Sequence, residues 1–347
     1  MTLPAEKQDK GRNAAGVLVV IVNYKTPALT VNCLRSLQHE QQALPGARVT
    51  VVDNASGDGS PETIEAAIRE NEWQWASVLP LEENLGFAGG NNAAIRPALQ
   101  KDDPPELFWL LNPDTIVHPG ALKELVSFLD HNRRAGIAGS LLQDAHGRPQ
   151  SSARRFPGVL SEFESSIRFG PVSRALSKYI VAIPPGNQPV RADWAPGASM
   201  MVRKEVFEGV GLFDEGYFLY YEEVDFCLRA ARAGWECWCV PESRVMHLEG
   251  QATGMASICK RRPTYWFESR HRYFTKSLGF IGAMAADCAW VAGYAAYRVI
   301  SFLRRKPRVD PPWLLWDFIY SCTLTGEREH RIGSTSVSQA PAIESET

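Results

Sequence analysis

The chain lacks the signatures of several common nucleotide-dependent enzymes. The apolar run VLVVIVN at 17–23 is followed by YKTPALT, with no G-x-G-x-x-G, which argues against a dinucleotide-dependent oxidoreductase. No G-x-x-x-x-G-K-[ST] occurs either, which argues against a P-loop kinase or ATPase. The net charge of -2 provides no basic field for nucleic acid. We therefore expect no nucleic-acid partner.

The seven cysteines lack ligand spacing, with no C-x-x-C pair. Cys237 and Cys239 alternate on an expected strand, which is typical of reduced packing residues. Reduced cysteines favour the cytoplasm. Residues 1–15 are polar, have no apolar signal-peptide core and are predicted to be flexible. Residues 333–347 are rich in Ser, Ala, Glu and Thr and are predicted to form a disordered tail.

What the sequence does contain is a regular alternation of strands and helices. Strands are predicted at 17–23, 48–53, 77–81 and 107–112, and helices from Thr26 and Pro27 onward and near 61–71, 87–100 and 119–132. Four strand–helix units in succession predict an α/β fold with a mostly parallel central sheet flanked by helices. Such sheets bind ligands at the carboxyl ends of their strands.

Polar residues stand at those ends. Asn23 and Tyr24 end the first strand, Asp53 ends the second, and Asn84 follows the third. Asp53 could form part of a turn, because DNASGDGS is dense in turn formers. It could also accept hydrogen bonds from a nucleoside, and its position at the carboxyl end of a strand favours this second function. Asp114, after the fourth strand, could cap a helix or bind Mg²⁺ or Mn²⁺.

Seven segments follow one another along the chain: IVNYKT (21–26), VVDNASGDGS (51–60), ENLGFAGGNN (83–92), LLNPDT (110–115), WAPGASMMVRKEVF (194–207), GLFDEGYFLYYEEVDFCLRAARAGW (211–235) and VPESRVMH (240–247). In this order they resemble the family-2 glycosyltransferases with the GT-A fold, in particular the bacterial rhamnosyltransferase-like branch. The resemblance implies a GT-A domain over 16–255, with a nucleotide-binding half at 16–140 and an acceptor and catalytic half at 141–255.

The resemblance also implies what the domain binds. The donor would be a nucleoside-diphosphate sugar, with dTDP-rhamnose suggested by the branch, and the acceptor a glycan or polyprenyl-linked saccharide of cell-surface polysaccharide assembly. Donor-binding residues carried over by position are Asn23, Tyr24, Asp53, Asn84, Gly86, Asn91 and Asn112. Trp194, Gly197 and Glu222 would line the acceptor or sugar pocket.

The implied metal site departs from the family pattern at one position. Asn112 and Asp114 stand where the family has Asp-x-Asp, so the first acid is replaced by an amide. Asp114 and His247 would hold a divalent cation, Mn²⁺ or Mg²⁺. Such a cation relieves the charge of a leaving diphosphate, so no general acid is needed. One carboxylate must then take the proton of the attacking hydroxyl, which suits transfer with inversion.

Three carboxylates compete for the role of base in YYEEVD. All three suit the first turn of a helix, because the helix dipole stabilises acids there. Asp225 can pair with Arg229 at i+4 and is expected to be structural. The family places the base at the second of its paired acids, which is Glu223.

Residues 256–332 are predicted to form a helical, amphipathic, membrane-associating extension. The stretch 277–303 is largely apolar and long enough to span a bilayer, but Asp287 lies near its centre. On a helical wheel, one line holds Asp287, Tyr294, Arg298 and Arg305, and the opposite side holds Leu278, Ala285, Ala292 and Leu303. Together with the basic run RRKPR (304–308), this pattern favours peripheral attachment to the cytoplasmic leaflet.

Three alternatives stay open from the sequence. The apolar stretch at 277–303 could be a helix packed on the catalytic domain. The protein could be a non-catalytic scaffold that binds a nucleotide sugar, although such a module need not keep Asp114, Glu223 and His247. A sugar nucleotidyltransferase would need a basic glycine-rich loop near the N-terminus, where NYKTPALT stands instead.

Overall fold

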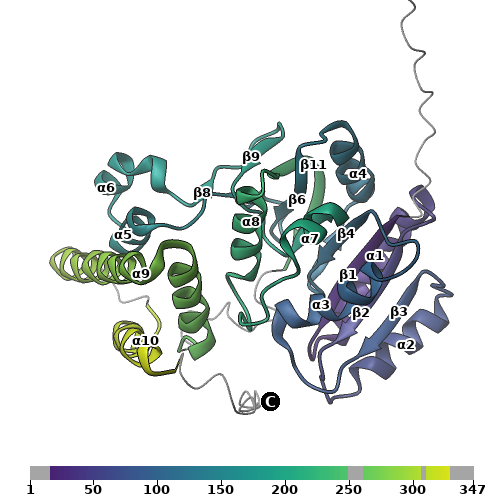
Figure 1. Cartoon of the computed structure of the whole chain (residues 1–347), viewed down its shortest axis with the longest axis horizontal. Coiled ribbons are helices and arrows are strands. Elements are labelled where there is room, and N and C mark those ends of the chain that lie inside the picture. Colours follow the sequence, from purple (N-terminus) through teal and green to yellow (C-terminus); the bar gives the residue numbers. More distant parts are fainter. Residues whose placement is uncertain (1–15, 249–260, 306–309, 329–347) are drawn as a thin grey trace, which may run out of the picture.

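The computed structural model of the chain describes residues 16–248, 261–305 and 310–328. The predictions for residues 1–15 and 333–347, and for Lys306 and Arg308 in the basic run, lie outside the described residues. Figure 1 shows a central sheet with helices on both faces and a helical extension at one end. The predicted α/β class is confirmed.

The first half follows the predicted alternation closely. Its elements are β1 (Val17–Asn23), α1 (Pro27–Ala43), β2 (Arg48–Asp53), α2 (Ser60–Glu70), β3 (Ala76–Pro80), α3 (Gly86–Leu99), β4 (Leu107–Leu111), β5 (Thr115–Val117) and α4 (Ala121–His131). Both α1 and α2 have proline in their first turn, where no amide hydrogen is required and φ is already helical.

The second half is less regular. It contains β6 (Ala135–Gln143), β7 (Ala153–Arg154), α5 (Val159–Ile167), α6 (Gly170–Ala175), the 3₁₀ turn η1 (Ser177–Tyr179), β8 (Ala182–Ile183), β9 (Val190–Ala192), β10 (Ser199–Arg203), α7 (Lys204–Val210), α8 (Glu222–Arg232), β11 (Glu236–His247), α9 (Thr264–Leu303) and α10 (Leu314–Arg328).

One large sheet joins the two halves, in the order β3-β2-β1-β4-β10-β6-β11-β5, with β9 paired to β11. Strands β1 to β4 are parallel, β10 is antiparallel to both β4 and β6, and β11 is parallel to β6. Asn23 and Asp53 lie side by side in register at the ends of β1 and β2. The sheet therefore brings the predicted donor residues to one edge.

Both faces of the sheet are buried, which explains the continuous apolar runs. Along β1, Val19 and Ile21 belong to the core cluster on one face, whereas Leu18 and Val20 belong to the cluster on the other. A strand covered by helices on both sides has no polar side to alternate with. Cys237 is buried in the second of these clusters, so it serves as a packing residue, and all described cysteines are free thiols.

The extension begins with a bent helix. Gly279, with φ of 72°, divides α9 into a proximal part (residues 264–278) and a distal part (residues 280–303). Tyr273 and Phe274 of the proximal part and Ala283 and Ala286 of the distal part lie in the same core cluster as α8. The hydrophobic core is therefore continuous from α8 into α9.

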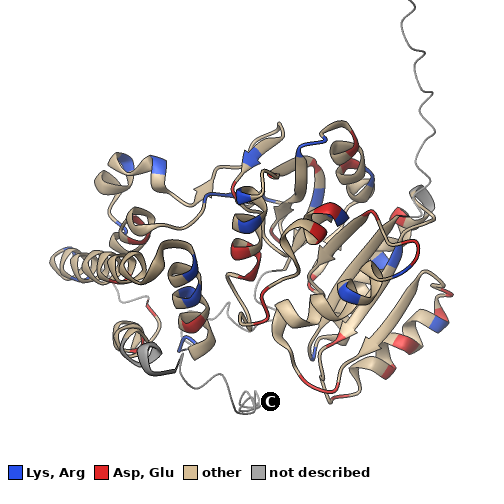
Figure 2. Cartoon of the chain, viewed as in Figure 1, with Lys and Arg blue, Asp and Glu red and all other residues tan. Residues whose placement is uncertain are grey.

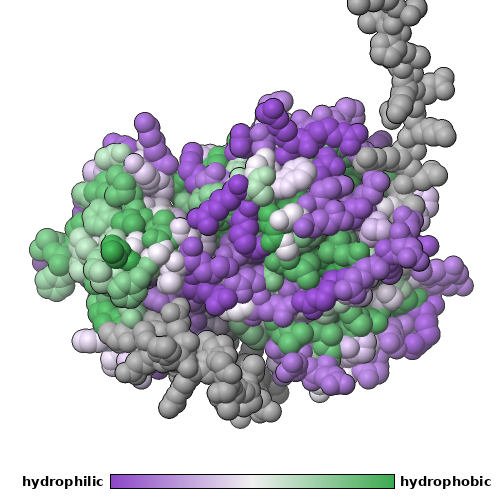
Figure 3. Space-filling model, viewed as in Figure 1, coloured by the Kyte–Doolittle hydropathy of each residue, from purple (hydrophilic) through white to green (hydrophobic). Residues whose placement is uncertain are grey.

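The distal part of α9 turns part of the predicted polar line toward the protein. Asp287 accepts a hydrogen bond from Arg270, and Tyr294 is buried and donates to Asp310, whereas Arg305 is exposed. The predicted apolar line is exposed at Leu278, Ala285, Ala292 and Leu303. The large apolar side chains of Phe280, Ile281, Met284, Val299 and Phe302 are exposed as well. Figure 3 shows hydrophobic residues gathered at this end of the molecule.

Candidate active site

The predicted donor-binding residues at the ends of β1 and β2, Asn23 and Asp53, form the donor edge of the site and belong to one hydrogen-bond network. Asp53 and Asn23 are both buried, and Asn23 Nδ2 donates to Asp53 Oδ1 at 2.6 Å. Ser56 donates to the same carboxylate through its hydroxyl and its backbone amide. Thr30 and Thr26 donate to Asn23 Oδ1. The carboxylate of Asp53 is thus fixed in place before any ligand arrives.

The sequence pattern singled out Asn84, and the structure pairs it with Asn54. Asn54 Nδ2 donates to Asn84 Oδ1 at 2.9 Å and to the carbonyl oxygen of Gly86, and Asn54 Oδ1 accepts from the Leu85 amide. The network joins the loop after β2 to the start of α3. Sequence reasoning did not single out Asn54 or Ser56, although both lie within the quoted VVDNASGDGS segment.

Three further predicted donor residues surround this network. Tyr24 is half-buried, and the Lys25 ammonium lies 5.3 Å from its ring centroid. Gly86 has φ of 68°, and a Cβ there would lie 2.0 Å from the carbonyl oxygen of Phe218, so close chain approach requires glycine. Asn91 is buried and donates to the Phe87 carbonyl oxygen within α3. Its amide therefore supports the helix that carries the glycine-rich segment.

The structure brings the two predicted metal ligands, Asp114 and His247, together with Asn112. His247 pairs with Thr115 across β11 and β5, which places its ring beside the loop after β4. His247 Nε2 lies 3.3 Å from Asp114 Oδ1 and 3.3 Å from Asn112 Nδ2. The second ring nitrogen of His247 is buried without a hydrogen-bond partner among the described residues.

The side chains of Asn112, Asp114 and His247 suit a cation that is also coordinated by a substrate. One carboxylate, one amide carbonyl and one imidazole supply hard oxygen and borderline nitrogen ligands. Within residues 16–248, 261–305 and 310–328, no group of three or more His, Cys, Asp or Glu side chains could hold a metal by itself. Mg²⁺ and Mn²⁺ sites commonly combine one or two carboxylates with substrate phosphates, so the residues fit.

Glu222 and Glu223 begin α8 and differ in exposure. Glu222 is buried at 3% exposure, whereas Glu223 is half-buried. Each has one carboxylate oxygen that is buried without a hydrogen-bond partner among the described residues. Asp225, by contrast, accepts from Arg229 at 2.8 Å and lies 2.7 Å from the Lys276 ammonium. The predicted pairing of Asp225 with Arg229 is confirmed.

The surroundings separate the two glutamates electrostatically. Burial, followed by the charge of Glu223, raises the pKa of Glu222 well above its usual value. Burial also raises the pKa of Glu223, but its own backbone amide, the Arg154 guanidinium and the Gly197 amide oppose that rise. Glu222 therefore holds its proton more strongly than Glu223 does.

A short segment links Glu223 to the metal-site residues. Gly197 interacts with the Glu223 carboxylate through its backbone, and the carbonyl of the next residue, Ala198, accepts from the Asn112 amide at 3.1 Å. A Cβ on Gly197 would lie 2.9 Å from the Phe87 ring. The predicted carboxylate and the loop that carries the predicted metal site therefore contact adjacent residues of one segment, Gly197 and Ala198.

Arg154 is a residue of this site that sequence reasoning missed. It lies on β7, with its guanidinium 5.2 Å from the ring centroid of Trp194 and within electrostatic range of Glu223. Trp194 is buried and donates its indole N–H to the Arg155 carbonyl oxygen. A two-residue strand carries no periodic signal, so only the tertiary structure reveals this cation.

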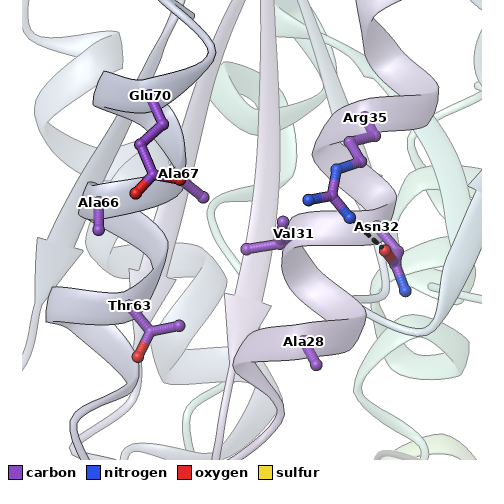
Figure 4. Close-up of a pocket in the computed structure, with 8 residues that line it drawn as sticks. All are labelled: Ala28, Val31, Asn32, Arg35, Thr63, Ala66, Ala67 and Glu70. Atoms are coloured by element: carbon purple, nitrogen blue, oxygen red, sulfur yellow. Dashed lines mark hydrogen bonds between the residues drawn. The ribbon is translucent and has the colours of Figure 1, made fainter.

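A surface groove elsewhere is separate from these residues. It has a volume of about 500 Å³ and lies between α1 and α2, where Arg35 and Glu70 face it from opposite helices (Figure 4). None of its lining residues belongs to the predicted donor, metal or catalytic set. The candidate site is instead defined by the strand ends and the start of α8.

Sequence comparisons agree with this arrangement. Residues 18–194 match Glycosyl transferase family 2, and residues 107–322 match Glycosyl transferase family group 2. The chain belongs to glycosyl transferase family 2, and it is a glycosyltransferase with the GT-A fold. This membership supports the enzyme over the scaffold and nucleotidyltransferase alternatives.

Three relatives illustrate the similarity. The N-acetylglucosaminyl-diphospho-decaprenol L-rhamnosyltransferase of Mycobacterium tuberculosis is 32% identical over 59% of this chain and 68% of its own. Rhamnosyltransferase WbbL of Escherichia coli is 32% identical over 47% of this chain and 60% of its own. The mannosyltransferase PcManGT of Pyrobaculum calidifontis, solved with GDP-Man and Mn²⁺, has a TM-score of 0.54 at 15% identity, over 91% of this chain and 81% of its own. Its likeness shows the fold.

Proposed function

We propose that this glycosyltransferase is an inverting enzyme that moves a rhamnosyl group from dTDP-rhamnose to a hydroxyl of a polyprenyl-linked saccharide. The observation that carries the proposal is the link through two adjacent residues. Gly197 contacts Glu223, and Ala198 contacts Asn112, which lies beside Asp114 and His247. An inverting transfer needs a base and a leaving-group site on opposite faces of the sugar.

Each residue of the site has a separate role in this reaction. Tyr24 and Asp53 bind the base and ribose of the donor, and Asn84 lies beside the ribose. Asp114 and His247, with Asn112, would hold a divalent cation, which would relieve the charge of the leaving diphosphate. Glu223 accepts the proton of the acceptor hydroxyl as that oxygen bonds to the anomeric carbon and the bond to the diphosphate oxygen breaks. Trp194 and Glu222 line the sugar and acceptor pocket.

The rhamnosyl donor and lipid-linked acceptor are supported by the names of the relatives. A panel of dTDP-, UDP- and GDP-sugars, measured by thermal shift with Mn²⁺, tests the donor. A ligand at a hundred times its Kd adds about 2.7 kcal/mol of stability, so dTDP-rhamnose should give the largest shift. Turnover on a polyprenyl-diphosphate-linked N-acetylglucosamine tests the acceptor. Stabilisation by a different sugar nucleotide alone would replace the donor and keep the rest of the proposal.

Metal dependence runs through Asp114 in this proposal. Asp114→Asn keeps the size of the side chain but removes the charge that holds the cation. We expect activity to be lost and partly restored by excess Mn²⁺, whereas Asp144→Asn, at an exposed turn, should leave the Mn²⁺ dependence unchanged. Full activity of the wild type in chelator would show that no divalent cation takes part.

The extension supports attachment to the cytoplasmic face of the membrane. Within the described part of the chain, α9 is the one helix that is long and apolar enough to cross a bilayer by length and composition. Figure 2 shows that Lys, Arg, Asp and Glu are frequent on α8 and the proximal part of α9. The exposed side of the distal part is apolar. Trp313, directly before α10, and Trp316, within it, are exposed as well. Tryptophan favours the membrane–water interface.

Vesicle sedimentation tests this attachment. Replacing Phe280, Ile281 and Phe302, each more than 70% exposed, with Ser should release the protein from anionic vesicles with little loss of stability. Replacing the exposed Arg304 and Arg305 with Gln should weaken binding to anionic vesicles only, by about 1 kcal/mol per charge. Absence of binding by the wild type to either kind of vesicle would count against peripheral attachment.

A further inference from the structure

Glu222 and Glu223 follow two residues with a rare backbone conformation. Tyr220 has φ of 73° and Tyr221 has φ of 69°, and Glu222 comes next. Bulky side chains seldom adopt the left-handed region, and two in succession require outside restraint. The direction in which α8 begins, and therefore the direction of Glu223, depends on these two residues.

The proximal part of α9 contacts every residue of the segment 218–221. The Tyr265 ring centroid lies 5.4 Å from that of Phe218 and 6.2 Å from that of Tyr220. Ser269 Oγ donates to the Leu219 carbonyl oxygen at 3.0 Å. These contacts hold the backbone from one side, and the Phe87 amide donates to the Phe218 carbonyl oxygen from the other.

The same part of α9 also holds the strained turn and α8. The Tyr273 ring lies 5.4 Å from that of Tyr221. The Lys276 ammonium lies 2.7 Å from Asp225, and Arg232 donates to the Ser277 carbonyl oxygen. The turn before Glu222 and the helix after it are therefore fixed by one element, which comes from outside the segments that carry the family resemblance.

A buried ion cluster anchors this element. Arg270 is 2% exposed, donates to Glu162 of α5 at 2.7 and 2.9 Å, and donates to Asp287 beyond the kink of α9. Its guanidinium lies 4.7 Å from the ring centroids of Phe274 and Phe318. An arginine with two carboxylates and two aromatic faces has little freedom to move, so the proximal part of α9 has a fixed orientation relative to α5 and α10.

We propose that the proximal part of α9 is a positioning element of the active site. It imposes the left-handed conformation on Tyr220 and Tyr221 and so aims the carboxylate of Glu223, with Tyr265 as the principal positioning residue. The proposal rests on the proposed role of Glu223 as the base. It assigns to the extension a part in catalysis that is distinct from membrane attachment.

The test combines aromatic rescue with backbone rescue. Tyr265→Ala should lower kcat at least tenfold with the Kd for the donor within twofold, whereas Tyr265→Phe, which keeps the ring, should stay within twofold of wild type. Glycine adopts positive φ readily. In a Tyr220→Gly background, Tyr265→Ala should therefore cost much less than in the wild type, which a double-mutant cycle measures.

Phe267→Ala is the matched control. Phe267 lies two residues after Tyr265 in α9 and is buried in the cluster with Trp290 and Phe318. Its ring contacts are with Trp266 and Phe318, and none is with the segment 218–221. Phe267→Ala should lower Tm and lower kcat of the folded protein less than Tyr265→Ala does. An equal loss of kcat in Phe267→Ala and Tyr265→Ala, or additive losses in the double-mutant cycle, would overturn the proposal.

Hydrogen exchange separates this proposal from the proposed donor. Peptides covering residues 217–226 should exchange faster in Tyr265→Ala than in wild type or Tyr265→Phe, whether or not dTDP-rhamnose is the substrate. If wild type does not turn over dTDP-rhamnose, the donor is wrong and the exchange result alone decides the positioning role. Unchanged exchange in Tyr265→Ala would overturn it.

Discussion

The carboxylates at the donor edge and at the start of α8 differ in their hydrogen bonding. Asp53 accepts three hydrogen bonds from Asn23 and Ser56, so its carboxylate is stabilised and oriented. Glu222 and Glu223 each keep a buried oxygen without a partner among the described residues, and burial raises the pKa of both. A satisfied carboxylate suits binding, whereas a desolvated one with an open oxygen suits proton transfer.

The largest effect expected from this difference is that of Glu223→Gln. Glutamine preserves the shape of the side chain but cannot take the proton of the acceptor, so kcat should fall by about 10² to 10⁴. Because the change removes an interaction needed only in the transition state, the Kd for the donor should stay close to wild type. Turnover and calorimetric titration of the same preparation measure both quantities.

Asp225→Asn is the control in the same helical turn. Asp225 is held by Arg229 and Lys276, so its loss should lower Tm with a smaller effect on kcat than Glu223→Gln. Near-normal turnover by Glu223→Gln would exclude Glu223 as the base. Loss of turnover in Glu222→Gln alone, with donor binding retained, would move the role to Glu222.

A smaller effect is expected at the donor edge. Asp53→Ala should weaken dTDP-rhamnose and free dTDP equally, because the contact is the same in ground and transition states. A hydrogen bond to a charged group contributes about 1.5–3 kcal/mol, which corresponds to about ten- to a hundredfold in Kd. Calorimetry with both ligands measures the ratio.

The structure adds a cost in stability to that variant. Removing the Asp53 carboxylate leaves the buried donors of Asn23 and Ser56 without their acceptor, so Tm should fall as well. Asp58→Ala, in the same loop but on an outer turn where it accepts from Ser60, is the matched control and should leave nucleotide affinity unchanged. Unchanged affinity in Asp53→Ala would remove Asp53 from the donor site.

The donor edge could be predicted from the sequence because its geometry follows from local rules. Continuous apolar runs identify buried parallel strands, and the carboxyl ends of such strands meet at one edge, so Asn23 and Asp53 had to be neighbours. The convergence of Asn112, Asp114 and His247 could be expected only from the family resemblance. It depends on the pairing of β5 with β11, which joins residues far apart in the chain.

The surroundings of the glutamates could not be predicted in the same way. Tyr220 and Tyr221 have no local reason to adopt positive φ; the restraint comes from Tyr265 and Tyr273. The helical wheel of 277–303 put Asp287 and Tyr294 on one line but could not show that both have partners within the protein. A wheel carries no information about a buried partner such as Arg270.

The smallest effect is expected for the stability of Glu222→Gln. The helix dipole favours a charged Glu222 by about 0.3–1 kcal/mol, which alone would make Glu222→Gln destabilising. Burial outweighs the dipole, because the pKa of Glu222 is raised well above its usual value. We therefore expect Glu222→Gln to match the wild type in stability at low pH and to exceed it near neutral pH.

The sign follows from proton binding. The folded protein binds the Glu222 proton more tightly than the unfolded chain, so the stability from this group is complete below an unfolded pKa of about 4.3 and is lost as pH rises toward the folded pKa. Glutamine does not titrate, so the variant's advantage grows with pH by at most about 1.4 kcal/mol per pH unit. Denaturant melts from pH 4 to 8 measure this difference in the free energy of unfolding.

Because Glu223 is one cause of the raised pKa of Glu222, the stability advantage of Glu222→Gln should shrink in a Glu223→Gln background. An advantage that is the same at every pH would show that Glu222 does not titrate between these states, and the contrast between the two glutamates would be lost.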